Sequence, residues 1–542
     1  MAGLGLVGRV GAALSGAVSG AVSGVLDGFS TEGGARSPYN AASRRQRLRG
    51  WIPTRQGPNS TVQLSAGELV ARSRDARRND PTAKRISDLL VTHVVGTGIK
   101  PSSQCPNKAL RAQLTQLFGD WVPFADADGQ LDFYGLQALA VGEMVGGGEA
   151  FCRLRTRRLS DGYPVPLQVQ VLPTEMLPMS WNVPTGNAGT TLLQGIERNG
   201  IGQRIAYWFY PEHPTDVRAV GDVTDYQPSR VPSADVCHLY RVDEAGQMRG
   251  LPWLSTALTT LHHLDAYLDA ELERKKAAAL LMTFIETPAG EAPPTAVDLA
   301  RLGPVTMGGG PGAGPDGLPA GLDGLPSVEL EPGTGVYLQP GEKVTFSAPV
   351  DVGSTFDIFI ATNHRRAAAA ANVLYEELTG DWRNMNDRTY RAAFNTFKRS
   401  IMAVQYGLVC QQFCIPVWNR FVDYAVAAGT ITVPAGMADA DLKRVSWAPQ
   451  RWDYINPAQD IAATGDELAL GITSRTDVIL ARGDDPAQVN AQIIADKAEE
   501  KASGLNFGLA SIRPQPEKAN EGTVGPEPPT MPPAPIPPTA GG

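Results

Sequence analysis

Hydrophobic spacing predicts long helices in the second half of the chain. We expect one from about Pro252 to Lys276, one from about Thr355 to Glu377 and one from about Asp387 to Ala428. In the first and third, apolar residues recur every three or four positions and so share one helix face. These stripes comprise Leu254, Leu258, Leu261, Leu264 and Leu268 in the first helix, and Phe394, Phe397, Ile401, Val404 and Leu408 in the third.

The first half of the chain mixes helices and strands. A helix is expected to begin near Pro81, capped by Asn79 or Asp80, and to end at Gly96. Another is expected from Asp132 to Met144, and the three glycines that follow it indicate a turn into a strand rather than a phosphate-binding loop, because no Lys-Ser/Thr pair accompanies them.

Alternating apolar and polar residues predict short β-strands from Val165 to Tyr240. Within this region the segment RNGIGQ, residues 198–203, is typical of a hairpin turn. A chain of 542 residues is too long for one ordinary core, so several folded units are expected. The fold class expected is α+β.

Three segments have compositions that do not suit a packed core. Residues 1–35 repeat Ser-Gly-Ala-Val, and we interpret them as a flexible arm rather than a signal peptide or membrane span, since they lack a run of Leu, Ile or Phe. Residues 303–327 are Gly/Pro-rich and predict a mobile loop, and residues 513–542 predict a disordered Pro-rich tail. No other segment is expected to cross a bilayer, so no stable membrane association is expected.

Charge is distributed unevenly along the chain. The first 90 residues contain 13 Lys+Arg and 6 Asp+Glu, although the whole chain has a formal net charge of -8. The basic runs at 44–49 and 72–78 are consistent with binding to phosphate or an acidic protein, or with a solvated basic arm.

Candidate metal and catalytic residues give weak signals. Cys410 and Cys414 share a helix face without a second ligand pair, and His262 with Asp265 or Asp269 has helical spacing but is more simply a solvated face. The sequence has no P-loop, no Gly-x-Ser-x-Gly elbow and no His-Glu-x-x-His motif. No catalytic residue, metal or cofactor is therefore expected.

The RGDD segment, residues 482–485, is the remaining catalytic candidate. Asp484 and Asp485 resemble a polymerase carboxylate pair, but Asp485-Pro486 is typical of an ordinary helix start. A DNA-binding protein or a DNA-processing, nuclease-like protein stays open as the alternative to a structural role.

Five segments, in order, resemble the portal proteins of lambda-like tailed bacteriophages. The resemblance spans about residues 38–508. It is carried by RNDPTAKRISDLLVTHVVGTGIKPSS, by VPSADVCHLYRVDEAGQMRGLPWLSTALTTLHHLDAYLDAELERKKAAA, by LEPGTGVYLQPGEKVTFSAP, by YEELTGDWRNMNDRTYRAAFNTFKR and by SRTDVILARGDDPAQV.

This resemblance implies a portal-type fold with a wing, a long-helix stem, a small β-containing clip and a helical crown, assembled as a ring. The implied divisions are a flexible arm (1–35), a basic arm and α/β wing (36–251), a first stem helix (252–280), a clip (281–353) with its Gly/Pro-rich insertion (303–327), a second stem helix (354–377), a tunnel loop (378–386), a helical wing and crown region (387–512) and a tail (513–542).

The resemblance also implies a function without catalysis. The ring, of about twelve subunits, would sit at one capsid vertex of the virion after assembly in the host cytoplasm. It would pass double-stranded DNA in packaging and ejection, and would contact terminase, a head-tail connector or adaptor protein, and the major capsid or scaffold protein.

The implied DNA-channel residues lie in two neighbouring segments. Asp381, Trp382, Arg383 and Asn384 belong to the tunnel loop, whereas His364, Arg365 and Arg366 of the second stem helix face the channel or a neighbouring subunit. The alanines at 367–371 permit close helix packing, either between subunits or within one subunit.

Overall fold

The computed structural model describes most of the chain between residues 52 and 504. The described residues are 52–53, 55–182, 189–216, 227–279, 283–285, 305–306, 335–337, 356–383, 385–450, 452 and 456–504. The predicted arm 1–35, most of the insertion 303–327, Asn384 and the tail 513–542 lie outside them. Contacts divide the chain into two units, Met1–Thr61 and Val62–Gly542, and nearly all of the described residues belong to the second.

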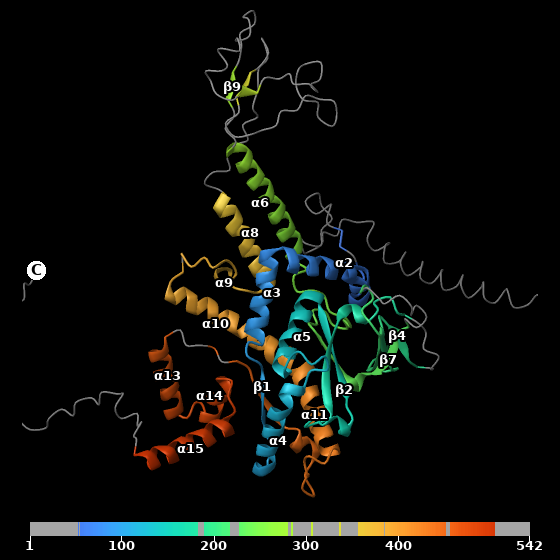
Figure 1. The fold of residues 1–542 in the computed structure, drawn as a ribbon, viewed down its shortest axis with the longest axis vertical. Coiled ribbons are helices and arrows are strands. Elements are labelled where there is room, and N and C mark those ends of the chain that lie inside the picture. Colours follow the sequence, from blue (N-terminus) through green and yellow to red (C-terminus); the bar gives the residue numbers. More distant parts are fainter. Residues whose placement is uncertain are drawn as a thin grey trace, which may run out of the picture. The chain divides into compact units, whose positions relative to one another are not determined.

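The described residues form an α+β fold (Figure 1). Its helices are α2 (Pro58–Asn79), α3 (Pro81–Val94), α4 (Lys108–Trp121), α5 (Phe133–Gly147), α6 (Leu258–Ala279), α8 (Phe356–Ala371), α9 (Tyr375–Thr379), α10 (Asp387–Val404), the π-helix η8 (Gln405–Cys414), α11 (Ile415–Ala427), α12 (Asp439–Leu442), α13 (Pro457–Ala469), α14 (Arg475–Ala481) and α15 (Pro486–Ser503).

The strands of the described residues form four small sheets. Their bounds are β1 (Lys100–Ser103), β2 (Glu149–Thr156), β3 (Leu167–Pro173), β4 (Thr191–Leu193), β5 (Ile196–Arg198), β6 (Arg204–Phe209), β7 (Ser229–Pro232), β8 (Val236–Tyr240), β9 (Thr283–Ile285), β10 (Val305–Thr306), β11 (Gly335–Tyr337) and β12 (Val445–Ala448). The sheet orders are β1-β12, β10-β11-β9, β3-β2-β8 and β4-β5-β6-β7.

Strand β2 separates two hydrophobic cores. Successive side chains of a strand point to opposite faces, and here Cys152 and Leu154 enter the main core whereas Phe151 enters the second. The main core also contains α3, α4, α5, η8 and α11, and the second is formed with the four-stranded sheet. The predicted hairpin at 198–203 is confirmed, since β5 and β6 pair antiparallel on either side of it.

Residues 72–78 are not part of a solvated basic arm. They belong to α2, where Arg74 is ion-paired with Glu143 and Glu175, and Arg77 donates a hydrogen bond to the carbonyl of Gly142. The sequence pattern missed this helix because its partners lie about 70–100 residues away along the chain. The basic run at residues 44–49 lies outside the described residues.

The predicted turn after α5 is confirmed, and Gly148 is its key residue. Its φ of 91° is in the left-handed region that favours glycine. A Cβ at this position would lie 2.5 Å from the backbone carbon of Leu251. The chain therefore passes directly from the end of α5 into β2 while the segment before α6 packs against the turn.

The predicted bounds of two long helices need correction. The first begins at Leu258 rather than Pro252, because residues 253–257 form turns before it. The second ends at Ala371 rather than Glu377, because Asn372 has a φ of 56°, a left-handed conformation that an α-helix excludes. The short helix α9 then follows.

The alanine run at 367–371 packs within one subunit. Ala367, Ala368 and Ala371 are buried in the main core, whereas Ala369 and Ala370 are exposed. Of the two explanations for the run, the intrasubunit contact applies to the three buried residues. The two exposed alanines place only methyl groups on the other face of α8 at these positions.

The third long helix runs from α10 through η8 to α11 without a break. Pro416 lies in the first turn of α11 and has no N–H to donate, which explains why the preceding segment widens into a π-helix. Contrary to the sequence expectation, this helix, Asp387–Ala427, is long and apolar enough to span a membrane. Its apolar face, including Phe397, Ile401 and Phe413, is instead buried in the main core.

Candidate functional site

The tunnel-loop candidates lie between α9 and α10 in a structured, exposed turn. Gly380 ends α9 in the left-handed conformation, and Asn386 caps α10 by accepting a hydrogen bond from the backbone of Thr389. Between them, Trp382 is 46% exposed and contacts the ring of Tyr390 edge-on, with the ring centroids 5.6 Å apart. The loop therefore presents a tryptophan at a fixed position.

The two charges of this loop are paired with each other. The Nε of Arg383 lies 2.8 Å from Oδ1 of Asp381, and its Nη2 lies 3.0 Å from Oδ2. These hydrogen bonds lower the pKa of Asp381 to about 2, so that carboxylate is ionised throughout the physiological range. Because the pair is bidentate, the loop carries no net charge from these two residues.

Tyr375 joins the loop to α8 and was missed by the sequence analysis. Its ring lies under the guanidinium of Arg365, 4.7 Å from centroid to Cζ, and its side chain contributes to the lowered pKa of Asp381. Of the other α8 candidates, Arg366 is exposed, and burial lowers the pKa of the half-buried His364. The structure thus brings Arg365 close to the loop.

A hydrogen bond between side chains fixes the other side of α9. Nε2 of His93 lies 2.8 Å from the carboxylate of Glu377, and Arg85 donates to the Glu377 backbone carbonyl. The His93 ring also stacks on Trp452, which contacts Phe394 of α10. The loop is therefore held at both of its ends by α3 and α10.

Helices α6 and α8 contact each other side by side (Figure 1). Tyr267 of α6 contacts the ring of Phe359 with centroids 5.0 Å apart, and Lys275 lies over the ring of Phe356. Both helices also expose large apolar residues, Leu272 and Ile358. The two segments that the sequence implied as stem helices are therefore in contact.

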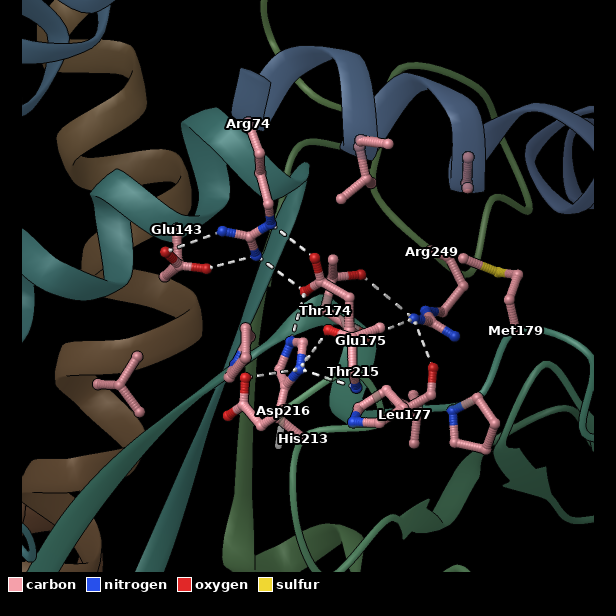
Figure 2. Close-up of a pocket in the computed structure, with 18 of the residues that line it drawn as sticks. Arg74, Glu143, Thr174, Glu175, Leu177, Met179, His213, Thr215, Asp216 and Arg249 are labelled. Carbon is pink, nitrogen blue, oxygen red and sulfur yellow. Dashed lines mark hydrogen bonds and ion pairs between the residues drawn. The ribbon is translucent and has the colours of Figure 1, made fainter. Parts of the chain in front are cut away.

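A pocket of about 840 Å³ lies under α2 (Figure 2). In Figure 2, Arg74 extends between Glu143 of α5 and Glu175, at 2.9 Å and 2.6 Å. Burial disfavours its charge, but the hydrogen bonds and charges of the two carboxylates outweigh burial and raise the pKa of Arg74. His213 lies at the opposite side, with Nε2 4.0 Å from Glu175. The principal charges of this pocket therefore compensate one another.

Behind the pocket, a buried network is centred on Glu149, the first residue of β2. Its carboxylate accepts from Arg249 (Nε, 2.7 Å), from the Thr174 hydroxyl (2.6 Å), from His238 (Nε2, 2.9 Å) and from the Gly250 backbone (3.0 Å). Burial opposes ionisation, but Arg249 and His238 outweigh it and hold the pKa of Glu149 far below its usual range.

The two basic side chains of this network are in different charge states. Arg249 also donates to the backbone carbonyls of Gln194, Thr174 and Leu177, so its guanidinium is surrounded by acceptors. Burial lowers the pKa of His238 to about 4, so its ring is neutral at pH 7. A neutral ring that donates from Nε2 to Glu149 leaves Nδ1 to accept from Arg204, 3.4 Å away.

The weaker candidates from the sequence do not form a site in the described part of the chain. All five cysteines are free and buried, and no group of three or more possible metal ligands occurs among the described residues, including around His262. Asp485 is the N-cap residue of α15, as the helix-start interpretation predicts, and accepts a hydrogen bond from Ser102 at 2.6 Å. Asp484 is exposed.

Comparison with known proteins identifies related sequences. Residues 44–405 match the family described as phage portal protein, lambda family. The chain is 25% identical to the probable portal protein of Halomonas phage phiHAP-1 over 454 residues, which cover 81% of each chain. It is 22% identical to the portal protein of Escherichia phage N15 over 194 residues, 34% of this chain and 36% of the relative.

Among solved structures, the chain is similar to one in the neck of a native GTA particle with C12 symmetry. The TM-score is 0.41 at 14% identity, covering 79% of this chain and 98% of the other. A chain in the virion of the native gene transfer agent particle gives a TM-score of 0.39 at 12% identity, covering 79% of this chain and 99% of that one.

Proposed function

Because the chain belongs to the lambda family of phage portal proteins, we propose that about twelve copies form a ring at one capsid vertex of the virion, through which double-stranded DNA is packaged and ejected. Each copy contributes a wing (36–251), a stem made of α6 and α8, a clip between them (281–353) and a crown within 387–512. Assembly takes place in the host cytoplasm. The ring contacts terminase and a head-tail connector through the clip, and the major capsid or scaffold protein around it.

The channel surface must guide DNA without holding it. Each Lys or Arg that neutralises a phosphate adds affinity that would retard sliding. Asp381 and Arg383 satisfy this requirement, because the bidentate pair leaves the exposed loop with little affinity for phosphate. The pairing of the two loop charges with each other, beside the exposed Trp382, is the main support for the proposal. We assign residues 378–386 to the channel as the tunnel loop.

The proposed role is mechanical and involves no catalysis by this chain. Terminase supplies the work of packaging, and the ring provides a conduit and docking surfaces. A DNA-processing enzyme would place several carboxylates together to hold metal ions. Within the described ranges no such group occurs, and Asp484 and Asp485 occupy a helix start.

The loop assignment is tested by neutralising Asp381. Asp381→Asn keeps the shape of the side chain but frees the charge of Arg383, so rings should bind duplex DNA more tightly. The slope of log affinity against log salt should steepen by about 0.9 for each phosphate newly contacted. Packaging by terminase should become slower, whereas the double variant Asp381→Ala/Arg383→Ala should behave like the parent.

Asp387→Asn provides a matched control, since Asp387 is an exposed acid of α10 that pairs with Arg391 outside the loop. Binding and salt dependence of this control should match the parent. If Asp381→Asn and Asp387→Asn bind DNA with the same affinity and the same salt dependence, the assignment of the loop to the channel is wrong. Loss of rings on replacing 381–384 with a Gly/Ser linker would instead make the loop an assembly element.

A further inference from the structure

Helices α13, α14 and α15 lack a core of their own. Between residues 456 and 504, Gly483 and Pro486 are buried, and neither α13 nor α14 contains a buried residue. None of these residues belongs to either hydrophobic core. Helices as short as α13 and α14 are marginal in water unless an apolar face is covered by tertiary packing. One copy of the chain does not supply that cover among its described residues.

The uncovered apolar residues of this segment are large. Ile461 is 51% exposed and Leu468, two helical turns later on the same face of α13, is 37% exposed. Leu470 and Ile472, which follow α13, are 74% and 72% exposed. Such a group in a soluble protein marks an interaction surface. The same segment contains nine acidic and four basic residues, so its partner should be basic and partly apolar.

A complementary surface lies on α10 and the start of η8. One face of this helix, with Phe397 and Ile401, is buried in the main core. The opposite face is exposed and its residues follow the four-three spacing of a helix–helix seam. We call this face the α10 stripe, and its residues are Arg388, Ala392, Asn395, Arg399, Met402 and Tyr406.

The α10 stripe combines charge with apolar area. Arg388 and Arg399 form no ion pair with any described acid, so both positive charges are uncompensated within this part of the chain. Met402 and Tyr406 are 39% and 46% exposed. Thr396, Ala403 and Gly407 beside the stripe are small or short and let another helix approach closely.

We infer that the α10 stripe of one copy binds α13 of a second copy, with Ile461 and Leu468 packing against Met402 and Tyr406. Glu467, which flanks this apolar face of α13, would lie near Arg399, about one helical turn from Met402. The inference rests on the proposed ring, in which every copy has neighbours in the same relative position. It assigns the C-terminal helices a role in joining subunits.

Duplex DNA is the competing occupant, since two arginines also suit phosphates. The apolar content of the stripe favours a protein partner. Contacts to the DNA backbone use charge and hydrogen bonds, so Met402, Tyr406 and Ala392 would gain little from them. The acidic, uncovered helices of another copy match both the charge and the apolar residues.

Charge reversal tests the pairing in the full-length protein. Arg399→Glu places a like charge against Glu467 of α13 and should raise the protein concentration needed for half-assembly about tenfold or more, as measured by mass photometry. Glu467→Arg should weaken assembly similarly. The variant that combines both changes should restore rings, since opposite charges face each other again.

A control and a folding measurement make the result interpretable. Arg72→Glu produces the same change in net charge as Arg399→Glu, at an exposed site on α2, and should assemble like the parent. Thermal unfolding of each variant should stay within a few degrees of the parent, because the stripe is on the surface.

The outcomes separate this inference from the proposed function. A parent protein that forms no rings would overturn the proposed function itself. Rings that form equally well in the parent and in Arg399→Glu would overturn only the inference, and normal rings with weakened DNA retention would assign the stripe to DNA. Failure of the double variant Arg399→Glu/Glu467→Arg to restore assembly would also contradict the pairing.

Discussion

Replacing Glu149 by glutamine should destabilise the fold strongly. The carboxylate is fully buried and receives hydrogen bonds from the Arg249 and His238 side chains, among others. Glutamine has nearly the same shape but no charge, and its amide nitrogen can only donate. It would therefore leave the buried guanidinium uncompensated and direct an N–H group toward other donors.

The magnitude follows from the burial of both partners. Removing one partner of a buried ion pair typically costs about 3–5 kcal/mol, because the remaining charge stays in a poorly solvated site. Glu197→Gln is the matched control: Glu197 is buried, but its partner Arg230 is 45% exposed and stays solvated. The control should cost about 1 kcal/mol or less. Both substitutions remove one carboxylate charge beside an arginine.

Thermal unfolding followed by tryptophan fluorescence measures this difference. At about 2 °C per kcal/mol for a chain of this size, Glu149→Gln should lower Tm by about 6–10 °C, and Glu197→Gln by about 2 °C at most. Equal shifts in the two variants would refute the argument from burial. Glu149→Leu/Arg249→Met should recover only part of the loss, because the carbonyls of Gln194, Thr174 and Leu177 would lose their donor.

Two further predictions concern the same region. The folded-state pKa of His238, about 4, lies below its ordinary value, so the unfolded chain binds more protons between pH 6.5 and pH 4. The free energy of unfolding should therefore fall by about 3 kcal/mol as the pH decreases across that window. Urea titrations at several pH values should show this decrease in the parent and not in a His238→Asn variant. Gly148→Ala should lower Tm by several degrees more than Gly162→Ala, since both have positive φ but only the first meets backbone atoms within 3 Å. Similar Tm values for the two glycine variants would contradict the close approach.

Local signals predicted the element types well where a segment determines its own structure. The Asp80-Pro81 start of α3 and the Asp485-Pro486 start of α15 depend on neighbouring residues and are confirmed. The hairpin between β5 and β6 is a similar case. At α3 and at the hairpin the capping or turn chemistry lies within a few residues, so the sequence contains the whole cause. At α15 only the helix start is local, because the Asp485 side chain makes no cap hydrogen bond and accepts from Ser102 instead.

Features that depend on distant partners were not predictable. The basic run at 72–78 is part of a helix because Glu143 and Glu175 bind Arg74, and no local pattern indicates that pairing. Likewise, the helix at Ala371 ends where Asn372 adopts a left-handed conformation, although its sequence would favour continuation. The network around Glu149 joins residues about 90–100 positions apart and gives no periodic signal.

At the loop, sequence and structure contributed different parts. The resemblance to portal proteins pointed to Asp381, Trp382 and Arg383, and the structure adds that the two charges neutralise each other and that Tyr375 connects them to α8. Pairing between side chains two residues apart depends on the turn that Gly380 begins. That geometry cannot be deduced from residue types alone.

The mass and shape of the purified full-length protein test ring formation directly. Mass photometry should give a species of about twelve 57.6 kDa chains, about 690 kDa, and electron microscopy of the same sample should show rings with a central channel wide enough for duplex DNA. A chain that stays monomeric or dimeric at micromolar concentration, with no rings in the images, would contradict the proposed portal function.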